Sequence, residues 1–315
     1  MKSFFLRAVA AVITFFMLIP AGQGNTGQYD VKSPETCRLN FSVLSDSHIE
    51  GNNYARYKVF ANSLQNVKRN KSGNDAVVFL GDNTMNCQNI ENLLFHGAVS
   101  AILPDEKILP VIGNHDLGNG EGDYKTLQSR WYDYTGAFFG RQLEHPYYYE
   151  VIDGYYFIVL GPESQGVYGM YISDEQYEWL EGVLAEAAKG DKPVFVFSHY
   201  PSDDAEDADG NPSSRLTDIL TAFNREHSVF GFVGHTHMPL YLFWSFHNDG
   251  YPEIYLPRLT QLAGNGDNEI YDESGVGVEV EVYDNEVIVR GRNFYKGEWR
   301  YDTADEKMCE VVYPY

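Results

Sequence analysis

Five short runs of hydrophobic residues recur along the chain, with longer polar stretches between them. Each run is four to six residues long and rich in Val, Ile, Leu and Phe, which is the length and composition of a buried β-strand. The runs cover residues 39–44, 76–80, 108–112, 194–197 and 229–233. We therefore predict five buried strands in this part of the protein.

The stretches between these runs carry hydrophobic residues at helical spacing. The pattern predicts helices over residues 57–67, 90–101, 177–184 and 215–223. Ser173, followed three residues later by Gln176, predicts a capping box at the start of the third helix. Strands that alternate with helices predict an α/β architecture with parallel strand pairing.

From about residue 251 the pattern changes. Residues 276–282 alternate between hydrophobic and polar with a period of two, and residues 287–292 follow a turn expected at Asp284-Asn285. This pattern predicts an antiparallel hairpin that closes a second sheet. Because no linker is visible, we expect one domain over residues 37–315, with a motif core at 39–239 and a strand-rich part at 251–300.

The first 24 residues have the pattern of a secretory signal peptide. Lys2 and Arg7 precede an apolar run at residues 8–19, and small residues follow. An uncleaved anchor is the alternative, but the run is shorter than the roughly 20 apolar residues of a membrane-spanning helix. We therefore expect cleavage between Ala21 and Asn25 and a secreted or periplasmic mature protein without a membrane span.

The charge and the cysteines add two expectations. A formal net charge of -22 disfavours nucleic acid as a partner, because phosphate backbones are bound by clustered Lys and Arg. The acidic stretch 202–211 would also repel polyanions and favour small substrates. In an oxidising compartment Cys37, Cys87 and Cys309 allow one disulfide, and we expect Cys37–Cys309 because chain termini often lie close together.

A cluster of polar residues capable of binding metals follows each of the five hydrophobic runs directly. Ligand sites in α/β proteins form beyond the carboxyl ends of the strands, so we expect the clusters to meet at one edge of one sheet. Ligands two residues apart would point the same way in extended chain, and the glycines would allow sharp turns. The clusters are Asp46-Ser47-His48, Gly81-Asp82-Asn83, Gly113-Asn114-His115-Asp116, Ser198-His199 and Gly234-His235-Thr236-His237.

These residue types predict a particular class of metal and ligand. Imidazole and carboxylate together favour borderline divalent metals such as Mn, Fe or Zn. If two such ions bind opposite the two carboxylates Asp46 and Asp82, a charge of about +2 remains. A cationic pocket of this kind indicates an anionic ligand, and a phosphate ester is the natural candidate.

The ordered set D-x-H, G-D, G-N-H-D, H and G-H-x-H resembles the calcineurin-like metallophosphoesterase superfamily over residues 39–239. The resemblance implies a two-sheet α/β/β/α sandwich and two divalent transition-metal ions. It also implies in-line attack on phosphorus by a hydroxide that bridges the ions. The implied roles are metal ligation by Asp46, His48 and His237 at one ion, by Asn114, His199 and His235 at the other, bridging by Asp82, general acid catalysis by His115, and orientation of His115 by Asp116.

Two positions distinguish branches of that superfamily. Purple acid phosphatases carry Gly where His48 stands here and a metal-binding Tyr where Met85 stands, so this chain is more similar to the phosphodiesterase branch. The resemblance thus implies a hydrolase of small phosphate esters, with diesters favoured, and the signal-peptide pattern implies that it is exported. A monoesterase or nucleotidase with the same metals is the alternative. A non-catalytic binding protein is disfavoured, because every ligand of the pattern is retained.

Overall fold

The computed structural model describes residues 27–263, 269–270, 274–302 and 306–315. The signal peptide predicted over residues 1–24 lies outside these ranges. Within them, no helix has the length and apolar character needed to cross a membrane.

The first sheet has seven strands, in the order β16-β15-β14-β1-β2-β3, with β17 also paired to β15. Its parallel part consists of three of the predicted strands, β1 (Leu39–Leu44), β2 (Ala76–Leu80) and β3 (Ile108–Val111). The hairpin of β14 (Val276–Val282) and β15 (Glu286–Asn293) pairs antiparallel with β1. The prediction that this hairpin closes a second sheet is therefore wrong, because it extends the first. The outer strands are β16 (Glu298–Trp299) and β17 (Glu310–Pro314).

The second sheet has six strands, in the order β10-β11-β9-β7-β5-β4. The predicted strands β7 (Val194–Phe197) and β9 (Val229–Val233) lie at its centre and pair in parallel. Around them lie β5 (Tyr155–Val159) and β11 (Pro252–Tyr255), with antiparallel β4 (Tyr148–Ile152) and β10 (Phe246–Asn248) at the edges. Two short sheets pair β6 (Met170–Tyr171) with β8 (Ala205–Glu206) and β12 (Leu262–Ala263) with β13 (Glu269–Ile270).

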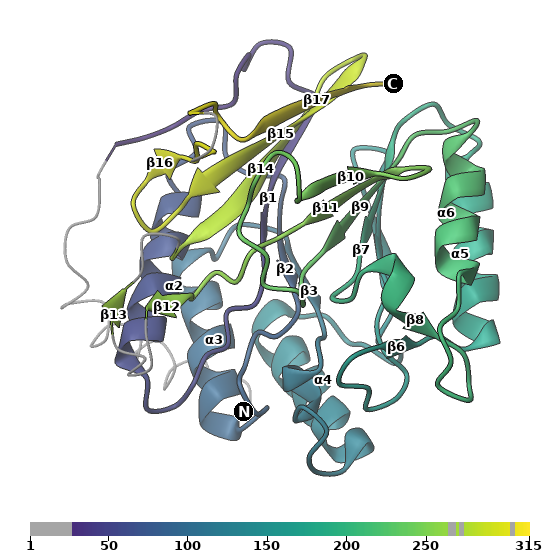
Figure 1. The fold of residues 1–315 in the computed structure, drawn as a ribbon. Helices are drawn as coiled ribbons and strands as arrows, with labels where there is room; N and C mark the ends of the chain where they lie inside the picture. Colours follow the sequence, from purple (N-terminus) through teal and green to yellow (C-terminus); the bar gives the residue numbers. More distant parts are fainter. Residues whose placement is uncertain (1–26, 264–268, 271–273, 303–305) are drawn as a thin grey trace.

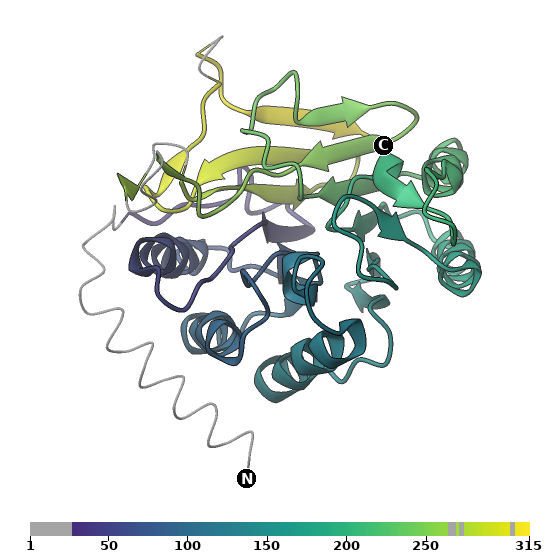
Figure 2. The ribbon, with the colours of Figure 1, turned by 60° about the horizontal axis from the view of Figure 1, so that its bottom comes forward.

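Helices cover the outer faces of the two sheets (Figures 1 and 2). On the first sheet lie α2 (Tyr54–Val67) and α3 (Asn89–Ile102), with α4 (Tyr124–Phe139) packed beside α3. On the second lie α5 (Asp174–Ala187) and α6 (Arg215–Asn224). Two short 3-10 turns, η1 (His115–Leu117) and η2 (Ser202–Asp204), follow β3 and β7. The α/β/β/α sandwich is thereby confirmed.

The core between the sheets forms around aromatic rings. Phe41 of β1 is fully buried and meets the rings of Phe157 and Phe195 edge-on at 5.0 Å. Because side chains alternate across a strand, Leu44 of the same strand packs instead with α2 and α3. Each sheet thus buries both faces, which explains why its central strands read as continuous hydrophobic runs.

Helix α5 begins with only half of the predicted capping box. The Ser173 side chain accepts a hydrogen bond from Gln176 N at 3.2 Å. The Gln176 side chain turns away and donates to Glu163 Oε2 at 2.8 Å, and Glu163 accepts the Ser173 N–H instead. The reciprocal bond from Gln176 was therefore wrongly predicted.

The predicted Cys37–Cys309 disulfide is also wrong, since all three cysteines are free thiols. Cys37 precedes β1. The carbonyl oxygen of Cys309 accepts a hydrogen bond from the Gly291 N–H, and Gly291 of β15 is level with Val43 of β1, with β14 between them. Six residues of extended chain correspond to roughly 20 Å along the strand direction. That separation far exceeds the span of a disulfide.

Candidate metal centre

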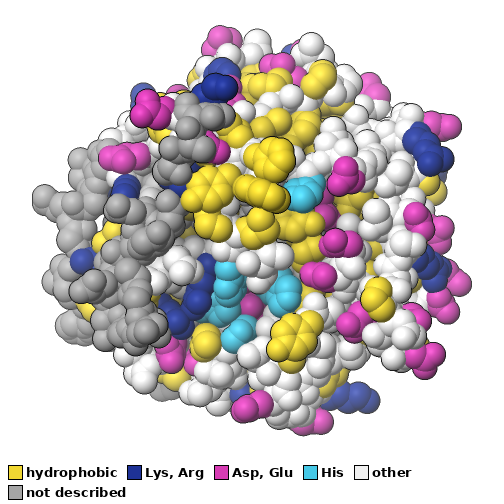
Figure 3. Space-filling model, viewed as in Figure 1, with side chains coloured by type: hydrophobic (Ala, Val, Ile, Leu, Met, Phe, Trp, Pro, Cys, Tyr) yellow, Lys and Arg dark blue, Asp and Glu magenta, His cyan; other side chains and the backbone are white. Residues whose placement is uncertain are grey.

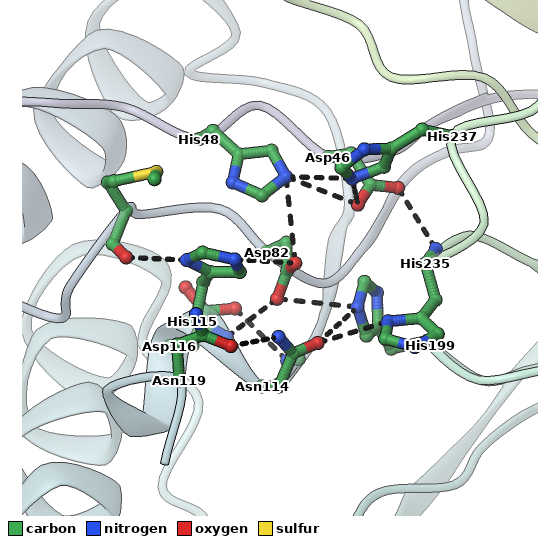
Figure 4. Close-up of polar contacts among 12 residues, drawn as sticks. Asp46, His48, Asp82, Asn114, His115, Asp116, Asn119, His199, His235 and His237 are labelled. Atoms are coloured by element: carbon green, nitrogen blue, oxygen red, sulfur yellow. Dashed lines mark hydrogen bonds and ion pairs between the residues drawn. The ribbon is translucent and has the colours of Figure 1, made fainter. Parts of the chain in front are cut away.

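The site lies where the loops after five strands meet, but these strands belong to two sheets. Asp46 follows β1, Asp82 follows β2 and Asn114 follows β3, all in the first sheet. His199 follows β7, and the pair His235 and His237 follows β9, in the second sheet. The prediction that the five polar clusters meet at one edge of one sheet is therefore wrong, although the clusters do meet at one site (Figure 4).

The backbone at these positions is left-handed rather than extended. Five of the seven predicted ligands have positive φ, a conformation that non-glycine residues rarely adopt. Residues two apart therefore converge through a sharp local turn, and the extended-chain explanation does not hold. The values are 54° at Asp46, 40° at His48, 48° at Asp82, 63° at His235 and 53° at His237.

Glycines allow the loops to approach this closely. Gly81 has a φ of 89°, which fits the predicted turn, and a Cβ there would lie 2.7 Å from the His199 ring. Gly113 and Gly234 are needed for a different reason, because neighbouring groups pack too closely against them to leave room for a side chain. A Cβ on Gly113 would lie 2.3 Å from Asp82 Oδ1, and one on Gly234 would lie 2.7 Å from Asp46 Oδ2.

One half of the site brings together Asp46, His48, His237 and Asp82, whose potential ligand atoms lie within 4.8 Å of one another. The Nε2 atoms of His48 and His237 are 3.1 Å apart. Asp46 Oδ1 lies 2.9 Å from His237 Nε2 and 3.4 Å from His48 Nε2. Two imidazole nitrogens and carboxylate oxygens that converge on one point form a donor set that fits a borderline divalent cation.

The other half brings Asn114, His199 and His235 next to Asp82. Asn114 Oδ1 lies 3.1 Å from His199 Nε2 and 3.1 Å from His235 Nδ1. Asp82 Oδ1 lies 3.3 Å from His199 Nε2, while its Oδ2 lies 3.6 Å from His48 Nε2. The Asp82 carboxylate thus stands between the two halves, as a bridging ligand would.

Hydrogen bonds from neighbouring groups fix which atoms face the site. His199 Nδ1 lies 2.7 Å from the Leu80 carbonyl oxygen, so Nδ1–H donates there and Nε2 is left to face Asn114. Asn114 Nδ2 donates to Asn119 Oδ1 at 2.9 Å, which turns the amide oxygen toward the histidines. This orientation is the one that metal ligation requires.

The charges of the side chains in the site are set by burial and by neighbouring groups. Burial alone would raise the pKa of Asp46, but hydrogen bonds from His237 and His48 outweigh it and hold the pKa well below its usual range. Burial lowers the pKa of His48 to about 4, and burial together with the charge of His199 lowers that of His235 to about 4. Both imidazoles are therefore neutral at pH 7 and have lone pairs available.

Burial would lower the pKa of His199, but the charge of Asp82 outweighs it and raises the pKa to about 9. The His199 imidazolium in turn outweighs the effect of burial on Asp82 and lowers the pKa of that carboxyl. The charges of His199 and Asp82 thus stabilise each other.

His115 lies beside the site without joining either ligand set. Its Nδ1 is 2.7 Å from the Met85 carbonyl oxygen, so Nδ1–H donates there. Its Nε2 faces inward, 4.0 Å from Asp82 Oδ2, and its ring meets that of His48 edge-on at 4.6 Å. The side chain is 14% exposed, so it borders the solvent-accessible side of the centre.

Asp116 does not orient His115 in this structure, and that prediction is wrong. Its carboxylate accepts hydrogen bonds from the backbone N–H groups of Asn83, Thr84 and Gly113 at 2.9–3.1 Å. Burial and the charge of Asp82 raise the pKa of Asp116 to about 7. Asp116 therefore ties the loop after β2 to the loop after β3, and the Met85 carbonyl holds His115 instead.

Residues 39–239 match the family described as calcineurin-like phosphoesterase. The chain belongs to this family. A dimetal phosphatase from Danio rerio is similar in fold, with 18% identity, a TM-score of 0.53, and coverage of 89% of this chain and 99% of that one. A purple acid phosphatase from yellow lupin is similar with 15% identity, a TM-score of 0.54, and coverage of 83% of this chain and 52% of that one. No curated protein matches the sequence.

Family membership and the Asp and His cluster identify this calcineurin-like phosphoesterase as a metal-dependent hydrolase of phosphoesters. The family acts on small phosphorylated substrates, which agrees with the predicted class of partner. The donor set fits a site for two divalent ions.

Sequence reasoning missed several residues that hold the site of this phosphoesterase. Ser45 Oγ donates to Asp46 Oδ2 at 2.5 Å, which leaves Oδ1 to face the histidines. Thr260 Oγ1 donates to the Ser47 carbonyl oxygen at 2.7 Å and so ties the segment after β11 to the loop of Asp46. Arg258 lies in that segment, and its charge adds to burial in lowering the pKa of His48. Only the Ser next to Asp46 could have been noticed from the sequence.

Proposed function

We propose that this calcineurin-like phosphoesterase is an exported two-metal phosphodiesterase. In this proposal Asp46, His48 and His237 hold one ion, Asn114, His199 and His235 hold the other, and Asp82 bridges them. The bound ions would act as Lewis acids on the phosphoryl group and generate the nucleophile from water.

The ligand assignment is supported by the direction of the side chains. Asp82 presents one carboxylate oxygen to each half of the site, at 3.3 Å from His199 and 3.6 Å from His48. The Nδ1 of His199 is used by a carbonyl oxygen, so its Nε2 is available. His48 Nδ1 is buried without a hydrogen-bond partner among the described residues, and His48 Nε2 points at the site.

The observation that carries the diesterase proposal is the inward-facing Nε2 of His115. With Nδ1–H donating to the Met85 carbonyl, a protonated His115 has its second N–H directed into the site. A phosphodiester with an alkoxide leaving group needs a proton at the departing oxygen. His115 can supply that proton as a general acid, a role that typically contributes 10²–10⁴-fold to the rate.

His115→Ala tests this role. We expect a loss of about 10²-fold or more in kcat/KM on diesters with alkoxide leaving groups. We expect a far smaller loss on nitrophenyl diesters, whose leaving group departs without a proton. Metal content, measured by elemental analysis, should be unchanged, because His115 is not an assigned ligand.

His145→Ala is the matched control, since His145 is an exposed histidine outside the site that stacks on Tyr147. It should behave like the unmodified enzyme on both substrates. Equal losses on both leaving groups in His115→Ala would remove His115 from the acid role. Faster turnover of mono-nitrophenyl phosphate than of bis-nitrophenyl phosphate by the unmodified enzyme would identify a monoesterase instead.

Export is supported by the charged start and the short apolar run of the first 24 residues. Expression of the full chain in a bacterial host, followed by fractionation and N-terminal sequencing, tests it. The mature protein should be extracytoplasmic and begin between Ala21 and Asn25. Protein that still begins at Met1 would contradict the proposal.

A further inference from the structure

Three aromatic side chains are the most solvent-exposed of the large hydrophobic residues that the structure describes, although burial of apolar surface is favourable. Tyr168 is 85% exposed, Phe243 is 79% exposed and Trp244 is 55% exposed. The other exposed large hydrophobic residues of the described chain range from 41% to 51%. Single exposed apolar residues are ordinary, but adjacent exposed rings beside a catalytic centre indicate a binding surface.

Phe243 and Trp244 are directly connected to the metal centre by the chain. The segment that holds them, residues 238–244, begins immediately after the assigned ligand His237 and reads Met-Pro-Leu-Tyr-Leu-Phe-Trp. The two rings meet edge to face, with centroids 4.8 Å apart. We call this pair of rings the aromatic platform.

The backbone around the aromatic platform is anchored while its rings face solvent. Leu240 is completely buried in the core between the sheets. Ser245 is buried, and its Oγ accepts from Tyr241 N and donates to the Pro239 carbonyl oxygen, both at 3.1 Å. Leu242 N donates to Asp302 Oδ2 at 3.0 Å. A preformed backbone can bind a ligand without the entropic cost of ordering a loop.

Tyr168 is held near the other half of the centre. Its loop is fixed by Gln165, whose side chain donates to the Leu117 carbonyl oxygen at 2.7 Å, close to His115 in sequence. Tyr200, next to His199, donates its hydroxyl to the Gly166 carbonyl oxygen at 2.8 Å. Figure 3 shows hydrophobic side chains gathered next to the exposed histidines.

The charge pattern favours a small ligand over a bilayer as the occupant of the aromatic platform. Residues 235–257 contain no Lys or Arg, and the whole chain has a net charge of -22. Apolar segments that dock on membranes usually combine their aromatic residues with basic residues that attract anionic lipid. Arg300 lies over the ring of Tyr241 at 6.0 Å, but residues 235–257 themselves supply no basic side chain. The segment that carries the aromatic platform follows directly on His237, an assigned ligand of the site for phosphate esters.

We infer that the preferred substrate of this enzyme carries an apolar substituent, alkyl or aryl, that packs on Phe243 and Trp244 while its phosphoryl group lies at the metal centre. The inference rests on the proposed function for the position of the phosphoryl group. The aromatic platform then determines specificity without taking part in the chemical step.

Calorimetric titration of the metal-loaded protein with non-hydrolysable phosphonates tests the inference without relying on turnover. Methylphosphonate and hexylphosphonate share the head group and differ in five methylenes, and phenylphosphonate represents the aryl case. Each methylene that is buried increases affinity about fourfold. We expect hexylphosphonate to bind at least about 15-fold more tightly than methylphosphonate, the increment of two buried methylenes.

The double variant Phe243→Ser/Trp244→Ser should reduce this ratio to near one. Val312→Ser is the control, because Val312 is 43% exposed on β17. At the level of Val312 the first sheet lies across from the start of β1, which is the opposite end of that strand from the metal centre. This control variant should keep the ratio. Thermal melting checks that both variants are folded, and single substitutions replace the double variant if it is not.

The outcomes separate this inference from the proposed function. If methylphosphonate binds and longer chains bind no more tightly, or if the ratio survives in the double variant, the inference is wrong. If the loaded protein binds none of the phosphonates, the proposed function fails, and the inference fails with it. If the protein binds phosphatidylcholine vesicles through Phe243 and Trp244 with no effect of chain length on phosphonate affinity, the aromatic platform docks on a bilayer instead.

Discussion

Replacing Gly113 with alanine is a direct test of the packing that brings the two sheets together at the metal centre. The added Cβ would lie 2.3 Å from Asp82 Oδ1, 2.5 Å from Asp82 N and 2.9 Å from His199 Cδ2. Ordinary contacts between heavy atoms are about 3.5 Å, so these groups must separate by about 1 Å. Asp82 Oδ1 has little freedom to move, because it accepts the His115 N–H at 2.8 Å. The φ of Gly113 is not positive, so the effect comes from contact rather than from backbone strain.

A displacement of about 1 Å in a catalytic group can reduce the rate about 10²-fold, which is about 2.7 kcal/mol of transition-state stabilisation. We therefore expect Gly113→Ala to lose about 10²-fold in kcat/KM on bis-nitrophenyl phosphate and to retain less metal by elemental analysis. Gly182→Ala is the matched control, because a Cβ there meets nothing within 4 Å on helix α5. It should keep full activity and gain roughly 0.5–1 kcal/mol of stability. Activity of Gly113→Ala within about threefold of the unmodified enzyme, with both ions retained, would refute this account of the packing.

Three further predictions concern metal binding, pH and helix capping. Asp82→Ala should bind fewer than two ions per chain by elemental analysis, because it removes the bridging carboxylate, and two retained ions would argue against a bridge. Burial raises the pKa of Glu279 to about 7 from 4.5, so its contribution to stability is complete below about pH 4.5 and is lost as the pH rises through about 7. By urea unfolding, the free energy of unfolding of Glu279→Gln relative to the unmodified protein should be roughly 3 kcal/mol higher at about pH 8 than at about pH 4. The same relative stability at both pH values would contradict the raised pKa of Glu279. Ser173→Ala should cost about 1 kcal/mol of stability by the same method, through loss of the hydrogen bond to Gln176 N, and an unchanged midpoint would show that Glu163 alone holds this helix start.

The central strands could be predicted from the sequence because their signal is local. Residues buried on both faces form short runs such as 76–80, and the strand there has the predicted bounds. The partition of the strands into two sheets could not be predicted, since β3 and β7 look alike in sequence and differ only in their distant partners. Helix α4 was not predicted, and the residues that it buries are only Leu127, Trp131, Thr135 and Phe138.

The donor atoms of the site could be predicted, whereas the groups that orient them could not. Side chains such as Asp82 and His199 are visible as motifs with fixed order along the chain. The carbonyl oxygens of Leu80 and Met85, which hold His199 and His115, belong to residues whose side chains carry no such signal. Asp116 shows the opposite error, because a carboxylate next to a histidine in sequence bonds to backbone groups in space.

The left-handed backbone at five of the assigned ligands has a consequence for the evolution and engineering of this protein. A non-glycine residue held in that region costs of order 1–3 kcal/mol. A variant library screened for heat or protease resistance would therefore enrich glycine or asparagine at positions such as His48 and His237, and the most robust clones would be inactive. Selection for durability and selection for turnover act in opposite directions at these positions.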